Sequence, residues 1–159
     1  MVKGFIGVLI IWITVFVIVY LYFETRLDSK VVVASASLER GEVLIPRSRD
    51  GHFYVQGAIN SYPVKFLVDT GASVVAISEE IAQRANLPTG KPASFSTAAG
   101  IVKGEMVYDQ TIDVGGIIVS GLQVSVGLHG DIALLGQNFL RNIDVIQTND
   151  RMILQIRAE

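Results

Sequence analysis

An unbroken apolar run near the N-terminus divides this chain into two parts of different character. Residues 4–23 contain no charged side chain. At a rise of about 1.5 Å per residue, a helix of this length reaches the thickness of a bilayer's hydrocarbon core. No face of the segment is polar, which argues against a helix packed on the surface of a water-soluble core. We therefore predict a transmembrane anchor within residues 1–23, with residues 24–159 folding outside the bilayer.

A cleaved secretory signal peptide is the alternative for this segment. The apolar part of a signal peptide usually spans 7–15 residues, and this run is longer. Ala34-Ser35-Ala36 is similar to a signal-peptidase cleavage site, but it lies well beyond the end of the run. The length of the run favours an anchor that is retained.

The charges beside the apolar run predict its orientation. Lys3 stands on the N-terminal side without a nearby acid, whereas Arg26 and Lys30 on the other side are balanced by Glu24 and Asp28. The positive-inside rule then leaves the N-terminus in the cytoplasm. In a bacterium this makes residues 4–23 an inner-membrane anchor and places residues 24–159 in the periplasm.

Composition excludes several classes of function. The formal net charge is −2 and no basic cluster stands out, so we expect no nucleic-acid partner. The chain has no cysteine, which excludes disulfides, Cys-based zinc sites and thiol nucleophiles. We expect no metal and no organic cofactor.

Short apolar runs separated by turn residues fill the remainder of the chain. Residues 24–50 have the mixed character of a connector, in which Val31–Ala34 and Val43–Ile45 could pair as edge strands. Residues 51–159 are predicted to form one all-β domain, a sandwich or a closed barrel with one or two short helices. The predicted strands are 52–59, 62–68, 74–77, 95–98, 101–113, 117–126, 132–135, 143–147 and 152–156, and the predicted helices are 79–86 and 137–141.

The triplet Asp69-Thr70-Gly71 is the most informative motif. An apolar strand, 62–68, runs directly into it and a second apolar strand follows. Asp and Gly are common in turns, so a simple turn is the plain interpretation. However, the strand after an ordinary turn would carry polar side chains on its outer face, and residues 74–77 are almost entirely apolar. A carboxylate between two apolar strands requires a hydrogen bond or a partner group.

This stretch resembles the active-site loop of retropepsin-like aspartic proteases, and the resemblance extends over residues 50–157. The segment from Gly51 to Asn60 is similar to the opening hairpin of the membrane-anchored bacterial branch. Ser96–Gly100 is similar to the flap hairpin of that branch, and Ala133–Gly136 with Asn138 to its second signature. Gln137 departs from the Arg that viral retropepsins carry after this glycine. The resemblance implies a closed retropepsin-like β-barrel and the hydrolysis of peptide bonds.

The number of aspartates constrains the quaternary structure. Peptide hydrolysis by this mechanism uses two carboxyl groups about 3 Å apart, which share a proton. The sequence contains one Asp-Thr-Gly triplet, since Asp113, Asp131 and Asp144 lack the following Thr-Gly. The second carboxyl must then come from a second copy, and a two-fold axis between identical loops supplies it. We therefore predict an obligate homodimer with one Asp69 from each chain.

The resemblance also implies a role for each residue of these motifs. Asp69 is the catalytic base and acid, and Thr70 bonds to its counterpart across the two-fold axis. Gly71 allows close approach of the backbone, Ala72 completes the loop, and Ser73 bonds to the outer carboxylate oxygen. An extended peptide is held under a mobile flap that bends at Gly100 and Gly104. The flap residues are Thr97, Ala98, Ala99, Gly100 and Ile101, and the second signature comprises Leu134, Leu135, Gly136 and Asn138.

Other catalytic patterns are weaker. His52 and His129 lack the spacing of a zinc site, and no serine occupies a Gly-x-Ser-x-Gly motif. The sequence leaves one alternative of a different class, a non-catalytic dimeric module of the same fold that binds an extended peptide without cutting it. The intact Asp-Thr-Gly triplet favours the protease, because a binding module has no need for a pair of buried carboxyls.

Overall fold

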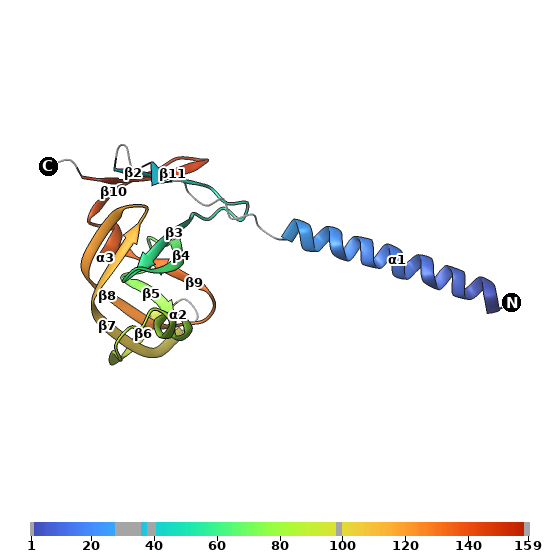
Figure 1. The fold of residues 1–159 in the computed structure, drawn as a ribbon, viewed down its shortest axis with the longest axis horizontal. Coiled ribbons are helices and arrows are strands. Elements are labelled where there is room, and N and C mark those ends of the chain that lie inside the picture. Colours follow the sequence, from blue (N-terminus) through green and yellow to red (C-terminus); the bar gives the residue numbers. More distant parts are fainter. Residues whose placement is uncertain (1, 28–35, 38–40, 98–99, 158–159) are drawn as a thin grey trace. The chain divides into compact units, whose positions relative to one another are not determined.

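The computed structural model describes residues 2–27, 36–37, 41–97 and 100–157, and it divides into two compact units, residues 1–30 and 31–159. The first unit contains one helix, α1 (Val2–Leu27), which includes the predicted helical segment (Figure 1). Within the described residues, no helix has both the length and the apolar character needed to cross a membrane.

The second unit is built mainly of strands. Its two helices in the described residues are α2 (Glu79–Arg84) and α3 (Gln137–Leu140). Its strands are β1 (Ala36–Ser37), β2 (Glu42–Pro46), β3 (Tyr54–Ile59), β4 (Tyr62–Val68), β5 (Val75–Ser78), β6 (Lys91–Thr97), β7 (Gly100–Val114), β8 (Ile117–Leu128), β9 (Ile132–Leu135), β10 (Ile143–Gln147) and β11 (Arg151–Ile156).

The larger sheet closes on itself as a barrel. Its strand order is β3-β4-β9-β5-β8-β7-β6, and β7 also pairs with β3. A closed ring is therefore formed by the six strands β3, β4, β9, β5, β8 and β7. Strand β6 extends from this ring as the outer arm of the β6–β7 hairpin. Closure gives each strand of the ring a partner on both sides. The predicted all-β closed barrel is confirmed.

Local turn signals place the hairpins where the sequence predicts them. Asn60 and Ser61 have φ angles of 47° and 74° and join β3 to β4, as expected of a two-residue loop with left-handed residues. Gly115 and Gly116 join β7 to β8 in the same way. Ser78 caps α2, since its hydroxyl accepts a hydrogen bond from the Ile81 N–H at 3.2 Å.

The second sheet has the order β1-β2-β11-β10 and lies beside the barrel in Figure 1. Val43–Ile45 pairs as predicted, but not at an edge, because β2 lies between β1 and β11. The other predicted edge strand, Val31–Ala34, lies outside the described residues.

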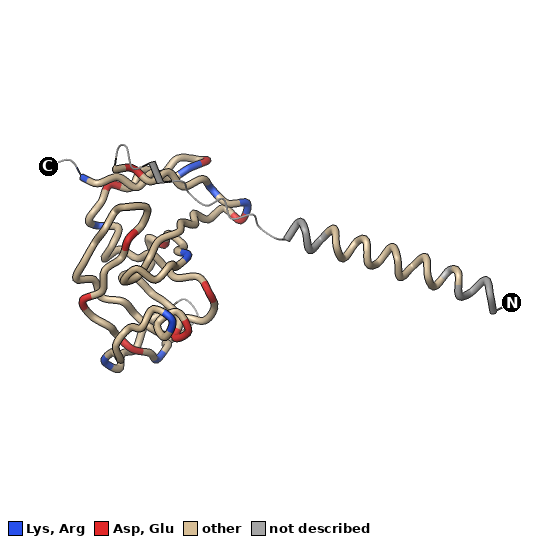
Figure 2. The backbone as a smooth tube through the Cα atoms, in the orientation of Figure 1, with Lys and Arg blue, Asp and Glu red and all other residues tan. Residues whose placement is uncertain are grey.

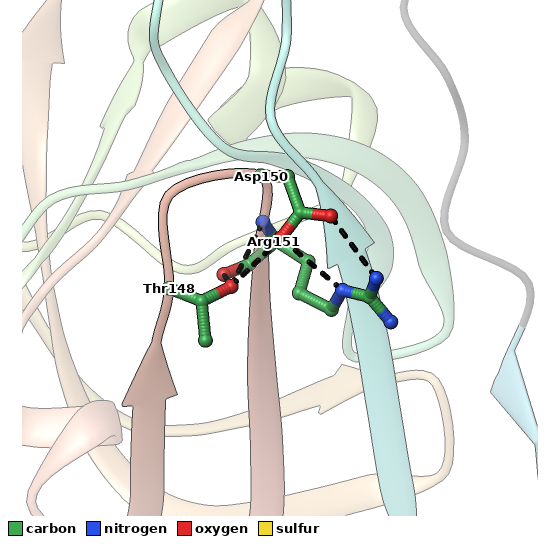
Figure 3. Close-up of polar contacts among 3 residues, drawn as sticks. All are labelled: Thr148, Asp150 and Arg151. Carbon is green, nitrogen blue, oxygen red and sulfur yellow. Dashed lines mark hydrogen bonds and ion pairs between the residues drawn. The ribbon is translucent and has the colours of Figure 1, made fainter.

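The β10–β11 turn is closed by three polar side chains (Figure 3). Asp150 accepts hydrogen bonds from the Thr148 hydroxyl and from Nη2 of Arg151, both at 3.0 Å. Arg151 and then Thr148 hold the pKa of the Asp150 carboxyl below its usual value. All three groups are exposed, so they define the turn and contribute little to stability.

One hydrophobic core joins the barrel to the second sheet. The barrel contributes Phe66, Ile77, Ile112, Val124 and Leu135, and the second sheet contributes Val43, Ile45, Met152 and Leu154, all at most 2% exposed. Strands β2 and β11 thus face the core with alternate residues. Charged residues of both signs are scattered over the described surface of the unit (Figure 2).

Candidate active site

Two parallel strands bring the predicted motifs together. β4 and β9 pair in parallel, with Val68 opposite Leu135. Both strands end at this position, so the Asp69 loop leaves β4 beside the point where Gly136 leaves β9. The Asp69 N–H donates to the Leu135 carbonyl at 3.2 Å. Asp69 and Gly136, which are far apart in the sequence, therefore lie close together in one site.

The Asp69 carboxylate is held by its own loop. Its Oδ1 accepts a hydrogen bond from the Gly71 N–H at 2.9 Å, and the Ala72 N–H donates to the Asp69 carbonyl at 3.3 Å. The side chain is partly exposed, and Thr70, Gly71 and Ser73 are exposed. Within the described residues of the single chain no hydrogen bond joins Ser73 to Asp69, and the role of Ser73 in the paired site stays a prediction.

Two residues at the start of α3, Gln137 and Asn138, hold this loop by hydrogen bonds. The N–H groups of Gln137 and Asn138 donate to the carbonyls of Ala72 and Ser73 at 2.8 and 3.1 Å. The buried Asn138 side chain accepts from the Val75 N–H at 2.9 Å and donates to the Gln123 carbonyl at 2.7 Å. Asn138 thus connects the loop to β8 and satisfies backbone groups that would otherwise be buried without a partner.

Gly136 is required by a close backbone approach. A Cβ atom at this position would lie 2.3 Å from the Val74 carbonyl oxygen and 2.9 Å from that of Ala72. These distances are shorter than any side chain allows, so the loop could not settle against the end of β9 with another residue there. The glycine of the second signature is therefore a packing residue.

The β6–β7 hairpin contains the described residues of the predicted flap. Thr97 is paired with Gly100 and Ser96 with Ile101, and the Thr97 hydroxyl donates to the Gly100 carbonyl at 2.8 Å. Ile101 is 78% exposed, so it belongs to no core. Ala98 and Ala99 lie outside the described residues. At Gly104 the backbone packs closely, because a Cβ there would lie 2.0 Å from the Val126 carbonyl oxygen.

A cleft of about 660 Å³ lies between the flap and the Asp69 loop. Its floor includes Asp69 and its roof includes Thr97. Of the described residues that line the cleft, Asp69 is the one with a charge; the others are Gly71, Ala72, Ser73, Val74, Ala76, Ser94, Phe95, Ser96, Val102, Thr97, Ser125, Gly127, Leu128 and Leu134. Apart from the Asp69 carboxylate, the described lining of the cleft is thus uncharged.

Several lining residues were not predicted from the sequence. Ser125, Gly127 and Leu128 reach the cleft because β8 pairs in parallel with β5, with Val75 opposite Val124. No motif marks this pairing. Conversely, Thr70, Gly100 and Ile101 belong to the predicted site but do not line the cleft of one chain, and Leu135, Gly136 and Asn138 are buried beneath it.

A turn between β2 and β3 supports the end of β4. The Asp50 carboxylate accepts hydrogen bonds from the His52 N–H at 3.0 Å and the Tyr54 hydroxyl at 2.8 Å, which lower its pKa. Burial and then the contact with Asp50 raise the pKa of Tyr54. The turn leads into Phe53, whose carbonyl accepts from the Val68 N–H at 2.9 Å, one residue before Asp69.

The histidines take no part in the cleft. His52 lies 3.5 Å from the Asp50 carboxylate, and neither it nor His129 is among the residues that line the cleft. In the part of the chain that the structure describes, no three His, Asp or Glu side chains gather as they would around a metal ion.

Comparison with known proteins identifies a family and several relatives. Residues 55–142 match the model of the family described as "gag-polyprotein putative aspartyl protease". An uncharacterized protein of Rickettsia prowazekii is 37% identical over 108 residues, which are 65% of this chain and 46% of that protein. An uncharacterized protein of a Sinorhizobium species is 28% identical over 129 residues, 76% of this chain and 54% of that protein. The matches thus cover about half the length of each relative.

A solved structure has the same fold. The crystal structure of a retropepsin-like aspartic protease from Rickettsia conorii superposes with a TM-score of 0.65 at 34% sequence identity. The match covers 73% of this chain and 91% of that one. The strands that carry the Asp69 loop and the flap fall within the family match.

Proposed function

Because this chain belongs to the retropepsin-like aspartic protease family, we propose that it is an aspartic endopeptidase that cleaves protein substrates as a homodimer. The family match covers residues 55–142 of 159, more than half of the chain. The observation that carries the proposal is the position of Asp69. Its carboxylate lies at the floor of an otherwise uncharged cleft, beneath the β6–β7 hairpin.

The need for two carboxyls supports the dimer. The cleft of one chain contains one carboxylate, on Asp69, among its described lining residues. The exposed Thr70 and Gly71 beside it are free of the barrel core and form a surface at which an identical loop can pack across a two-fold axis. In the proposed site Thr70 bonds to its counterpart, and the two Asp69 side chains face each other.

The proposed reaction is the addition of water to a peptide carbonyl. One Asp69 carboxylate accepts a proton from the water as its oxygen bonds to the carbonyl carbon, and the other Asp69 carboxyl donates its proton to the carbonyl oxygen. The protonated Asp69 carboxyl then donates its proton to the amide nitrogen while the other Asp69 carboxylate accepts a proton from a hydroxyl of the adduct, and the C–N bond breaks. The products are a carboxylic acid and an amine, and the pair of carboxyls again holds one proton.

The lining of the cleft supports a proposal for the class of substrate. Phe95, Val102 and Leu128 offer apolar contacts, and no charge apart from that of Asp69 is present among the described lining residues. Charged side chains would lose their hydration there without a partner. We therefore propose substrates with uncharged, mainly apolar residues beside the scissile bond, held in an extended form by backbone hydrogen bonds to the flap.

The proposed location depends on the sequence alone. Residues 4–23 are proposed as an anchor in the inner membrane of a bacterium, with the protease domain in the periplasm, because the run is long, uncharged and preceded by Lys3. Confinement to a membrane would raise the effective concentration of the chains and favour pairing.

The dilution behaviour of the soluble domain tests the proposed dimer. Residues 31–159 form a compact unit and should cleave a library of apolar peptides with a specific activity that falls as the protein is diluted. The fall should coincide with the dissociation of dimers measured by sedimentation. The full-length chain in lipid vesicles, at the same bulk concentrations, should lose much less activity. A domain that remains fully active while demonstrably monomeric would contradict the proposed site.

A further inference from the structure

The side chain of Gln137 reaches back to the catalytic triplet. Gln137 is the first residue of α3, and its Nε2 donates a hydrogen bond to the Thr70 carbonyl at 3.0 Å. The N–H groups of Gln137 and Asn138 hold Ala72 and Ser73, in the second half of the loop. The side chain of Gln137 extends this support to the first half, next to Asp69.

The bonded carbonyl belongs to the peptide unit that orients the Asp69 carboxylate. The Thr70 carbonyl and the Gly71 N–H are opposite ends of one planar trans peptide, so they point in opposite directions. The Gly71 N–H donates to Oδ1 of Asp69 at 2.9 Å. A continuous series of hydrogen bonds therefore runs from the Gln137 amide through this peptide to the catalytic carboxylate.

This arrangement fixes the plane of one peptide from both sides. Rotation of the 70–71 peptide would break both hydrogen bonds at once, and each bond polarises the peptide in the direction that strengthens the other. The series contains no charge until it reaches Asp69. Gln137 is thus a neutral support at the position where viral retropepsins carry Arg.

We propose that Gln137 is a positioning residue that orients the Asp69 carboxylate through the Thr70–Gly71 peptide. The proposal rests on the proposed function for its effect on catalysis, whereas the hydrogen-bond series itself belongs to the single chain. The bond needs a donor on residue 137, which an ionised carboxylate of the same size does not have.

The substitution Gln137→Glu in the full-length chain tests this role. At pH 7 the introduced carboxylate would face the Thr70 carbonyl without a proton to donate, and we expect kcat/KM to fall about tenfold, near the upper end for loss of one hydrogen bond. On acidification through the usual glutamate range, about pH 4.3, the protonated side chain can donate again. The ratio of variant to wild-type activity should then rise towards one. Taking the ratio at each pH corrects for the pH dependence that the wild type already has.

Gln147→Glu is the matched control. Gln147 lies in β10, is exposed and is outside the cleft lining, so this variant adds the same charge and should follow the wild type at every pH. If Gln137→Glu also follows the wild type, or loses activity by a factor that does not change with pH, the positioning role is wrong.

A second measurement does not depend on catalysis. The NMR chemical shift of the Gly71 amide proton should differ between wild type and Gln137→Glu at pH 7, and the difference should shrink as the introduced carboxyl is protonated. An unchanged shift overturns the proposal. If no peptide is cleaved by the wild type, the proposed function fails, while the Gly71 shift still decides whether Gln137 holds this peptide.

Discussion

Replacing Asp69 by asparagine is expected to lower kcat by at least about 10³-fold, within the range for loss of a general acid–base group. The amide can neither accept the proton of the attacking water nor share a proton with its counterpart. The fold should survive, because the Oδ1 atom of asparagine can still accept the Gly71 N–H. Cleavage of an apolar peptide, measured with sedimentation and circular dichroism on the same sample, would separate the loss of chemistry from a loss of structure.

Asp131→Asn provides the matched control for this variant. Asp131 is exposed, lies just before β9 and does not line the cleft. The substitution removes the same charge and should leave kcat within about twofold of the wild type, as is usual for a surface change. An Asp69→Asn dimer that kept most of its activity would show that another group performs the catalysis.

Gly136→Ala is expected to reduce the free energy of unfolding by about 3 kcal/mol, the upper end of the usual overpacking cost. The added methyl group would lie 2.3 Å from the Val74 carbonyl oxygen, and this neighbour is backbone that α3 already holds in place. Relief of the clash requires the Asp69 loop to move, so activity should fall with stability. Urea denaturation of residues 31–159 at fixed protein concentration measures the change.

Gly121→Ala is a suitable comparison, because it adds the same methyl group at a glycine that has no close neighbour. Gly121 has a φ of 75°, but nothing lies within 4 Å of a Cβ built on it. Its substitution introduces left-handed strain of about 1–2 kcal/mol without a collision. A loss of stability for Gly136→Ala no greater than that for Gly121→Ala would mean that the loop adapts to the methyl group and that the close approach is not required.

Apart from the closed barrel, which the family resemblance implied, the features that the sequence predicted are those with local causes. The β3–β4 hairpin follows from Asn60 and Ser61, the start of α2 from Ser78, and the Asp69 loop from the apolar strand that runs into it. In each case the residues that determine the geometry are adjacent along the chain. Such features can be identified without knowledge of the tertiary structure.

The features that the sequence did not predict depend on pairings between distant segments. β2 lies inside the second sheet because it pairs with β11, more than a hundred residues later. Ser125 and Leu128 line the cleft because β8 lies parallel to β5. The carbonyl of Ser73 accepts a hydrogen bond from the Asn138 N–H, a contact between segments that no local pattern predicts. The resemblance identified the motifs, but the partner of each atom required the structure.

The most direct test of the shared site is the activity of mixed dimers. Wild-type and Asp69→Asn chains of residues 31–159 would be mixed in varying proportions at a constant total concentration and allowed to exchange subunits. If each site needs Asp69 from both chains, total activity should fall as the square of the wild-type fraction, to about one quarter in an equal mixture. A linear fall, to about one half in that mixture, would show that each chain carries a complete site and would contradict the dimeric mechanism.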